Sequence, residues 1–137
     1  MKIVELKQVP IMKRGHFERS DIKMEPHEED TATYLTLYGL NIEVVRSVNT
    51  PKVNNPDIFI AGSLWEMKAP ISYNENTLKK HFKKASKQSD NVIFDLRNAK
   101  QDATKIEQFV IKKYQEPGRI RRMILIQANG RVLDFFK

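Results

Sequence analysis

Two carboxylates and a lysine near the middle of this 137-residue chain have the types and spacing that phosphate chemistry needs. Asp57 is followed by Glu66 and then by Lys68 in a Glu-x-Lys arrangement. One or two carboxylates, completed by water and substrate phosphate, are typical ligands of Mg²⁺ or Mn²⁺. Such a metal activates water and stabilises the charge that builds on phosphate. Asp57 and Glu66 are therefore candidate metal ligands, and Lys68 is a candidate to position water or to neutralise phosphate oxygens.

A β-hairpin is the element expected to position these side chains. Short apolar runs at 58–60 and 64–67 flank a small turn, a pattern that predicts two paired strands. If the turn residues are 61–62, the hairpin register places Asp57 directly opposite Glu66. Like charges opposite each other on a sheet are destabilising unless something compensates, and a divalent cation would compensate.

Alternation along the second strand sorts its side chains between two faces. Lys68 shares the face of Glu66, while Trp65 and Met67 point the other way. The alternative is an exposed hairpin face whose Glu66 and Lys68 are ordinary solvated charges.

A helix is predicted over residues 26–40, opened by a proline and acidic residues and closed by a glycine. Glu28 lies on the same stripe of this helix as Ala32 and Leu35. A carboxylate on a core-facing stripe is costly to bury unpaired, so it either faces a metal or a base or ends the stripe at the surface. As a first-turn residue, Glu28 can also simply favour the helix dipole.

The remaining pattern predicts one α/β (α+β) domain spanning residues 1–137. Segment 1–25 has no clear periodicity, and it either adds an edge strand or serves as a linker. The other expected elements are a strand at 41–48, a polar loop at 49–55, a helix at 76–89, a strand at 91–96, a helix at 103–115 and a C-terminal hairpin of 123–127 with 131–136.

The element order and the motif together resemble the core of the PD-(D/E)xK nuclease superfamily over about residues 26–97. The stretches 55–70 and 84–96 further resemble the C-terminal toxin domains of contact-dependent growth-inhibition proteins and related mobile-element proteins, several of which are tRNA nucleases. The resemblance implies a restriction-endonuclease-like αβββαβ core with a mixed central sheet flanked by helices. Residues 98–137 would then form a C-terminal extension of a helix and a hairpin.

The resemblance also implies roles for the acidic residues and the lysine. Asp57 and Glu66 match the metal-binding carboxylates, Lys68 matches the catalytic lysine, and Glu28 matches the acidic residue often found on the first helix. The cofactor expected on this basis is Mg²⁺ or Mn²⁺.

Substrate contacts are expected from the helix that follows the motif. Lys84 and Gln88 correspond to polar residues that this helix often directs at the site, and His81 lies along the same border of its apolar stripe. Lys80 beside them is a further candidate. The alternative for this basic run is a solvated helix face.

The function implied by the resemblance is metal-dependent endonucleolytic hydrolysis of nucleic acid by a toxin-type nuclease, with tRNA as the favoured substrate and DNA as the alternative. A different possibility is a metal-independent RNase of another fold, in which His81, Lys68, Thr77 and Ser86 do the acid and base work. A nucleic-acid-binding module without catalysis, a DNA endonuclease of a mobile element and a protein-interaction adaptor are also compatible with the sequence.

The charge balance agrees with a nucleic-acid partner. Lysine and arginine exceed aspartate and glutamate by seven, with clusters at 79–87 and 112–122. The absence of cysteine excludes disulfides and thiolate zinc ligands. No apolar run approaches the ~20 residues that span a membrane, and no signal peptide follows Met1. We therefore expect a cytoplasmic site of action and no membrane. The resemblance to toxin domains further implies delivery as the C-terminal part of a larger secreted protein and an acidic immunity protein as partner.

Overall fold

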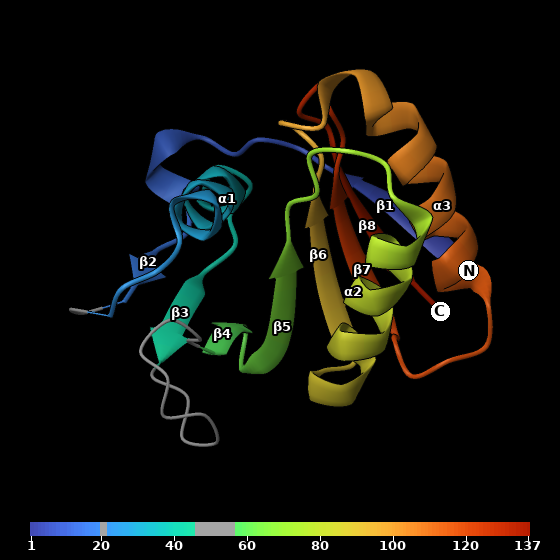
Figure 1. Ribbon diagram of the computed structural model, residues 1–137. Coiled ribbons are helices and arrows are strands. Elements are labelled where there is room, and N and C mark those ends of the chain that lie inside the picture. The colour runs from blue at the N-terminus through green and yellow to red at the C-terminus, as the bar shows by residue number, and fades with distance from the viewer. Residues whose placement is uncertain (20–21, 46–56) are drawn as a thin grey trace. The chain divides into compact units, whose positions relative to one another are not determined.

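A computed structural model of the chain describes residues 1–19, 22–45 and 57–137, including only the backbone of Asp57. Within these residues, eight strands pair into a mixed sheet in the order β1-β8-β7-β6-β5-β4-β3-β2, and three α-helices accompany them (Figure 1). The strands are β1 (Lys2–Leu6), β2 (Phe17–Glu18), β3 (Ile42–Val45), β4 (Asp57–Ile60), β5 (Ser63–Lys68), β6 (Asn91–Asp95), β7 (Arg122–Ile126) and β8 (Val132–Phe136). The helices are α1 (Pro26–Thr36), α2 (Glu75–Gln88) and α3 (Ala103–Gln115), with single 3₁₀ turns η1 (Ile11–Lys13) and η2 (Lys100–Asp102).

The chain divides into two compact units. The larger unit consists of Met1–Leu6 with Glu66–Lys137, and the smaller unit consists of Lys7–Trp65. Strand β5 therefore gives its first three residues to the smaller unit and its last three to the larger one.

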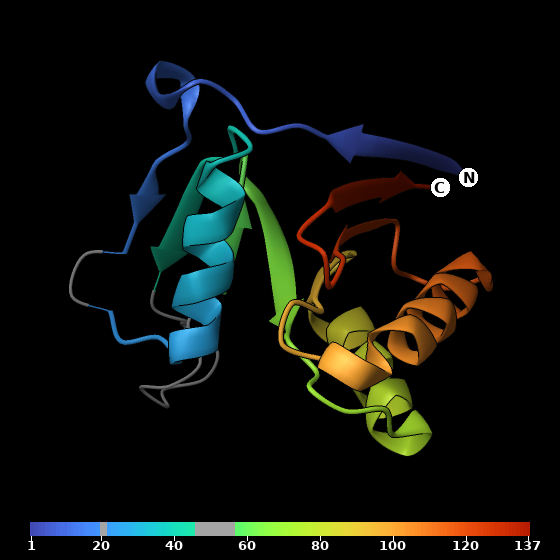
Figure 2. The same ribbon diagram turned by 90° about the horizontal axis from the view of Figure 1, so that it is seen from above.

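The larger unit is built on parallel pairing of β5 with β6 and of β6 with β7, extended by antiparallel β8 and β1. Helices α2 and α3 lie side by side on one face of these strands (Figure 2). Every second residue of β6 and β7 points at the helices, and the resulting core is fully enclosed. Its members include Leu78, Phe82, Val92, Phe94, Ile106, Val110, Tyr114, Met123, Leu125 and Phe135.

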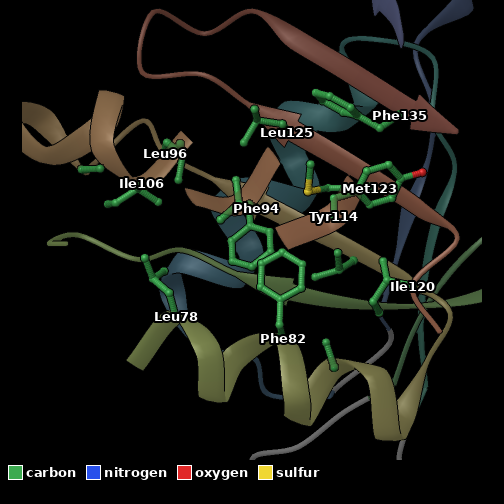
Figure 3. Packing of buried hydrophobic residues seen from close by; sticks show 14 of the residues in the cluster. Leu78, Phe82, Phe94, Leu96, Ile106, Tyr114, Ile120, Met123, Leu125 and Phe135 are labelled. Atoms are coloured by element: carbon green, nitrogen blue, oxygen red, sulfur yellow. The ribbon is translucent and has the colours of Figure 1, made fainter. Parts of the chain in front are cut away.

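The stack of Phe82 on Phe94 ties α2 to the sheet. Their ring centroids are 5.1 Å apart with planes inclined by 26°, and Figure 3 shows the two rings meeting at the centre of the core. Burial of a phenylalanine side chain is worth about 1.5–3 kcal/mol, and an aromatic pair adds about 0.5–1.5 kcal/mol. This contact fixes the rotation of α2 about its own axis.

The smaller unit contains α1, β2, β3, β4 and the start of β5. Ala32 and Leu35 of α1 are fully buried, and buried Ile42 and Val44 of β3 alternate with exposed Glu43 and half-buried Val45. Gly15 packs so closely against the Leu40 carbonyl that any side chain at this position would clash with the backbone.

The elements follow the predicted order, with small corrections at their ends. Helix α3 has the predicted bounds, α2 begins and ends one residue earlier, and β6 ends one residue earlier. In the C-terminal hairpin, β7 begins and ends one residue earlier, and β8 begins one residue later than predicted. The helix predicted over 26–40 ends at Thr36, because the carbonyls of Leu35 and Thr36 accept short-range bonds from the amides of Tyr38 and Gly39. The predicted strand 41–48 is described only as far as Val45, and the predicted loop 49–55 lies outside the described residues.

Segment 1–25 supplies two strands rather than one. β1 pairs with β8 at one edge of the sheet, and β2 pairs in parallel with β3 at the other. No helix in the described part of the chain has the length and apolar character that crossing a membrane requires.

One buried charge gives the larger unit a pH dependence. Asp134 of β8 is 6% exposed, its Oδ2 accepts a bond of 2.9 Å from Arg122, and its Oδ1 has no partner among the described residues. Burial raises the pKa of Asp134, and Arg122 opposes part of that rise. Because the folded state holds the proton more tightly than the unfolded state, the contribution of Asp134 to stability falls as pH rises from the ordinary value of 3.8 through the folded pKa.

We therefore expect Asp134→Asn, which keeps the shape and removes the charge, to melt at or above the wild-type temperature at pH 7. The difference should shrink as the pH is lowered toward about 4, where the wild-type carboxyl also takes up its proton. Thermal unfolding at both pH values measures this, with Asp90→Asn, an exposed partner of Arg119, as the control. A variant that melts several degrees below the wild type at pH 7 would show instead that the ion pair with Arg122 outweighs the cost of burial.

Candidate active site

The β4–β5 hairpin has the predicted register. Ile58 pairs with Trp65 and Ile60 pairs with Ser63. The turn residues Ala61 and Gly62 both have positive φ, 50° and 82°, as a two-residue turn of the type I′ class requires. The turn prediction is thus confirmed.

The register also locates the two carboxylates of the motif along their strands. Asp57 immediately precedes Ile58, and Glu66 immediately follows Trp65, which is the partner of Ile58. The backbone of Asp57 begins β4 opposite Val45, and its side chain lies outside the described residues.

Alternation along β5 separates the charged side chains from the apolar ones, as predicted. Trp65 is 2% exposed and Met67 is 5% exposed, whereas the side chains of Glu66 and Lys68 are 22% and 18% exposed. Lys68 Nζ lies 3.4 Å from Glu66 Oε1, so the two charges form a half-buried ion pair.

The parallel pairing of β5 with β6 aims this ion pair at α2. Glu66 aligns with Val92 and Lys68 aligns with Phe94, and both of these partners belong to the core under α2 and α3. Glu66 and Lys68 therefore lie on the helix-covered face, at the border of its apolar core.

His81 is the residue of α2 that the structure places near Lys68. Burial, then the positive charges of Lys68 and Lys84, lower the pKa of His81 below its ordinary value of 6.5. Its Nδ1 is buried and has no hydrogen-bond partner among the described residues. Protonation of Nδ1 would create a buried donor without an acceptor, so the lowered pKa and the burial of Nδ1 both favour a neutral ring with its proton on Nε2.

Two of the other polar residues predicted on α2, Lys84 and Gln88, share the side of His81, whereas Lys80 points further toward solvent. Residues 77, 81, 84 and 88 are spaced so that they follow one border of the helix. Lys80, Lys84 and Gln88 are exposed, and of these Lys84 is close enough to act on His81 electrostatically. Substrate contacts from Lys80, Lys84 and Gln88 stay predictions.

Glu28 has a structural role at the start of α1. Its Oε1 accepts a bond of 3.3 Å from the Glu25 amide. The Glu25 side chain in turn accepts a bond from the Glu28 amide, which completes a capping box. This interaction accounts for an acidic residue in the first helical turn, and a catalytic role of Glu28 stays a prediction.

Of the two carboxylates predicted to bind the metal, Glu66 is the one whose side chain the structure describes. Among the described residues, no three histidine, aspartate or glutamate side chains are grouped as a metal site. A magnesium site needs only one or two carboxylates when water and phosphate complete the coordination shell. Glu66 and Asp57 together would supply that number. The metal ligand set therefore stays a prediction.

The sequence did not single out an ion pair at the end of β6. Asp95 is 4% exposed and holds Arg97 through bonds of 3.0 and 2.7 Å from Nε and Nη2, and it also accepts the Arg97 amide. The Asp-x-Arg spacing after a buried strand is the available signal. The pair fixes the turn that leaves β6.

Comparison with known proteins identifies the family. The sequence from residue 54 to residue 132 matches the family model described as contact-dependent growth inhibition CdiA C-terminal domain. No curated protein matches the sequence.

A solved structure shares the fold. It is described as a CdiA-CT/CdiI toxin and immunity complex from Burkholderia pseudomallei; the likeness has a TM-score of 0.65 at 23% identity and covers 90% of this chain and all of the other. The predicted resemblance to growth-inhibition toxin domains is confirmed at the level of the family, whereas the PD-(D/E)xK assignment stays a prediction. Because the family match extends over more than half of the sequence, the chain belongs to the family of CdiA C-terminal domains of contact-dependent growth inhibition.

Proposed function

We propose that this domain is a nuclease toxin of the PD-(D/E)xK type that hydrolyses phosphodiester bonds, with tRNA as its favoured substrate. The observation that carries the proposal is the half-buried Glu66–Lys68 pair beside a neutral His81 in a basic chain. Family membership adds weight, because C-terminal domains of CdiA are often nucleases.

Lys68 supplies the positive charge at the scissile phosphate. Its ammonium is held by Glu66 at the border of the core, where partial burial strengthens its interaction with an approaching anion. A fixed charge aimed at oxygens that become more negative in the transition state lowers the barrier, because little reorganisation is needed during the reaction.

Glu66 and Asp57 are the proposed ligands of a Mg²⁺ or Mn²⁺ ion. Such an ion, when bound, supplies an activated water and neutralises charge on the phosphate. In its absence Glu66 keeps Lys68 in place, so Glu66 has a role in both conditions.

His81 acts as a neutral hydrogen-bond donor. With its proton on Nε2, the ring can donate to a phosphate oxygen without adding a second full charge beside Lys68. Lys84 and Gln88 continue the polar border of α2 that carries His81. These two residues and the exposed Lys80 are proposed to hold flanking phosphates, and Glu28 is proposed to support the site from α1.

The biological setting follows from the family. We propose that the domain acts in the cytoplasm of a target cell after delivery as the C-terminal part of a larger secreted protein. An acidic immunity protein is the proposed partner, since the related B. pseudomallei toxin is described in complex with its CdiI protein.

A metal-independent RNase is the second candidate, and the nearness of Lys68 to His81 favours it. Thr77 lies on the same border of α2 as His81, but Ser86 lies on the opposite border, where its hydroxyl donates to the Lys83 carbonyl. This scheme needs His81 as a base, and its lowered pKa and buried Nδ1 make it a weak one.

Replacement of the lysine tests the core of the proposal. We expect Lys68→Ala to lower the rate of tRNA cleavage by about 10²–10³, the loss seen when one fixed transition-state donor is removed. Lys87→Ala, which removes an exposed lysine from the solvent side of α2, should change the rate less than about twofold. Equal rates for the two variants would remove Lys68 from the site.

Metal dependence separates the two candidate mechanisms. Cleavage of total tRNA and of plasmid DNA should require Mg²⁺ or Mn²⁺ and should stop with EDTA or with Asp57→Ala. Mn²⁺ should also raise the melting temperature of the wild type but not that of Glu66→Gln or Asp57→Ala, since a ligand that binds only the folded state stabilises it. Cutting that survives EDTA and Asp57→Ala would establish the metal-independent RNase, and binding without cutting would leave a binding module.

Two replacements of the histidine distinguish a donor from a base. His81→Gln keeps an N–H near the position of Nε2, so we expect its cleavage rate to stay within about fivefold of wild type, whereas His81→Phe should lose about 10²-fold. If the ring acts as a base, both variants should lose activity alike. Circular dichroism of both variants controls for folding.

A further inference from the structure

A basic groove runs between α2 and α3 in the larger unit, on the other side of α2 from His81. It consists of two hollows of about 650 and 410 Å³ that share Lys79, Lys113 and Glu116 in their walls. Because the shared residues line both hollows, the two hollows adjoin each other and together form the groove. Helices α2 and α3, which carry most of the lining residues, lie side by side (Figure 2).

The spacing along α2 explains why the groove is separate from the candidate active site. Lys79, Lys83 and Ser86 follow one border of the apolar stripe, and the border that carries His81 lies on the other side of it. The stripe itself is buried against the sheet through Phe82 and its neighbours. Helix α2 therefore presents two basic borders to two different surfaces.

The groove concentrates the positive charge of the chain. Seven cationic side chains line it against two carboxylates, a net charge of +5 in a chain whose formal net charge is +7. The cationic lining residues are Lys79, Lys83, Lys105, Lys112, Lys113, Arg119 and Lys137.

The ion pairs already present in the groove are weak competitors for a ligand. Lys79 pairs with Glu75 at 3.2 Å, and both side chains are more than half exposed. Lys113 pairs with Glu116 at 3.1 Å, with 35% and 49% of the two side chains exposed. Arg119 pairs with Asp90 at 2.8 Å, and both of these side chains are more than half exposed. Exposed pairs of this kind contribute about 0–1 kcal/mol, so phosphates can replace the carboxylates at little cost.

An aromatic pair lies in the same groove. Tyr73 is 37% exposed and stands edge-on to Phe109, with ring centroids 6.3 Å apart. The Tyr73 amide donates to Asp102 Oδ2 at 2.7 Å, which ties this loop to the start of α3. An exposed ring on an anchored backbone, in the same groove as Lys105 and Lys112, provides a stacking platform for a base next to charges for phosphates.

We propose that the α2–α3 groove binds a single-stranded segment of nucleic acid, with phosphates along its lysines and a base on Tyr73. The inference rests on the proposed function for the identity of the substrate class, and it adds a binding surface outside the reacting site. A lysine-lined groove with an exposed aromatic ring fits a single strand, because unpaired bases leave their faces free to stack.

The test is binding of a labelled oligouridylate of about 12 nucleotides, and of the matching oligothymidylate, over a range of salt concentrations. All proteins in this binding experiment carry Lys68→Ala so that cutting does not interfere. We expect Lys83→Gln/Lys112→Gln to weaken binding and to reduce the slope of log K against log salt by about 1.4, since each lost phosphate contact removes about 0.7. Tyr73→Ala should weaken binding about tenfold and leave the slope unchanged.

A matched control removes the same charge elsewhere. Lys13→Gln/Lys87→Gln takes two exposed lysines from outside the groove and should leave the salt slope near that of the parent protein. Equal slopes for the groove and control variants would overturn the proposal. Loss of binding to polyglutamate with unchanged binding to both oligonucleotides would also overturn it, since the groove would then be a docking face for an acidic protein.

Cleavage read separately keeps this inference distinct from the proposed function. For this readout the groove variants carry the native Lys68. They should lower the cleavage rate of long RNA and spare that of a dinucleotide, because a dinucleotide is too short to reach the groove. If the groove binds RNA but the wild-type protein does not cut it, the proposed nuclease activity would be refuted, whereas the proposed binding surface would be supported.

Discussion

The packing of α2 against β6 is the constraint on which the rest of the larger unit depends. The Phe82–Phe94 stack and the burial of Leu78 fix which side of the helix faces the sheet. Once that side is fixed, the two neighbouring sides of the helix have no freedom left. One must turn toward the end of β5, and the other must turn toward α3.

The charged residues of β5 obtain their place from the same sheet. Parallel pairing aligns Lys68 with Phe94, so the lysine lies at the border of the apolar core that α2 covers. A lysine there is sufficiently shielded from solvent to interact strongly with an anion, and Glu66 lies 3.4 Å from its ammonium nitrogen. Core packing and candidate chemistry are thus two consequences of one strand register.

Local signals made much of this predictable. The 58–60 and 64–67 runs, the turn at 61–62 and the apolar stripe of α2 each obey a short-range rule, and the structure follows all three. Short-range rules could not predict contacts between distant segments. Strand β1 pairs with β8 from the opposite end of the chain. A glycine is required at position 15 only because the Leu40 carbonyl approaches its backbone. For the same reason helical spacing alone did not separate His81 from its neighbours, although its approach to Lys68 helps to set its pKa.

The lysines of α2 show why a charge run need not be one solvated face. Residues 79–87 look uniform in the sequence, yet helical spacing divides them between the border near Lys68 and the border in the α2–α3 groove. Lys83, which lines the groove, has no ion-pair partner among the described residues, and Lys79 has an exposed one. Such charges repel one another and contribute little to folding, so their concentration on the walls of one groove is better explained by an anionic ligand than by stability.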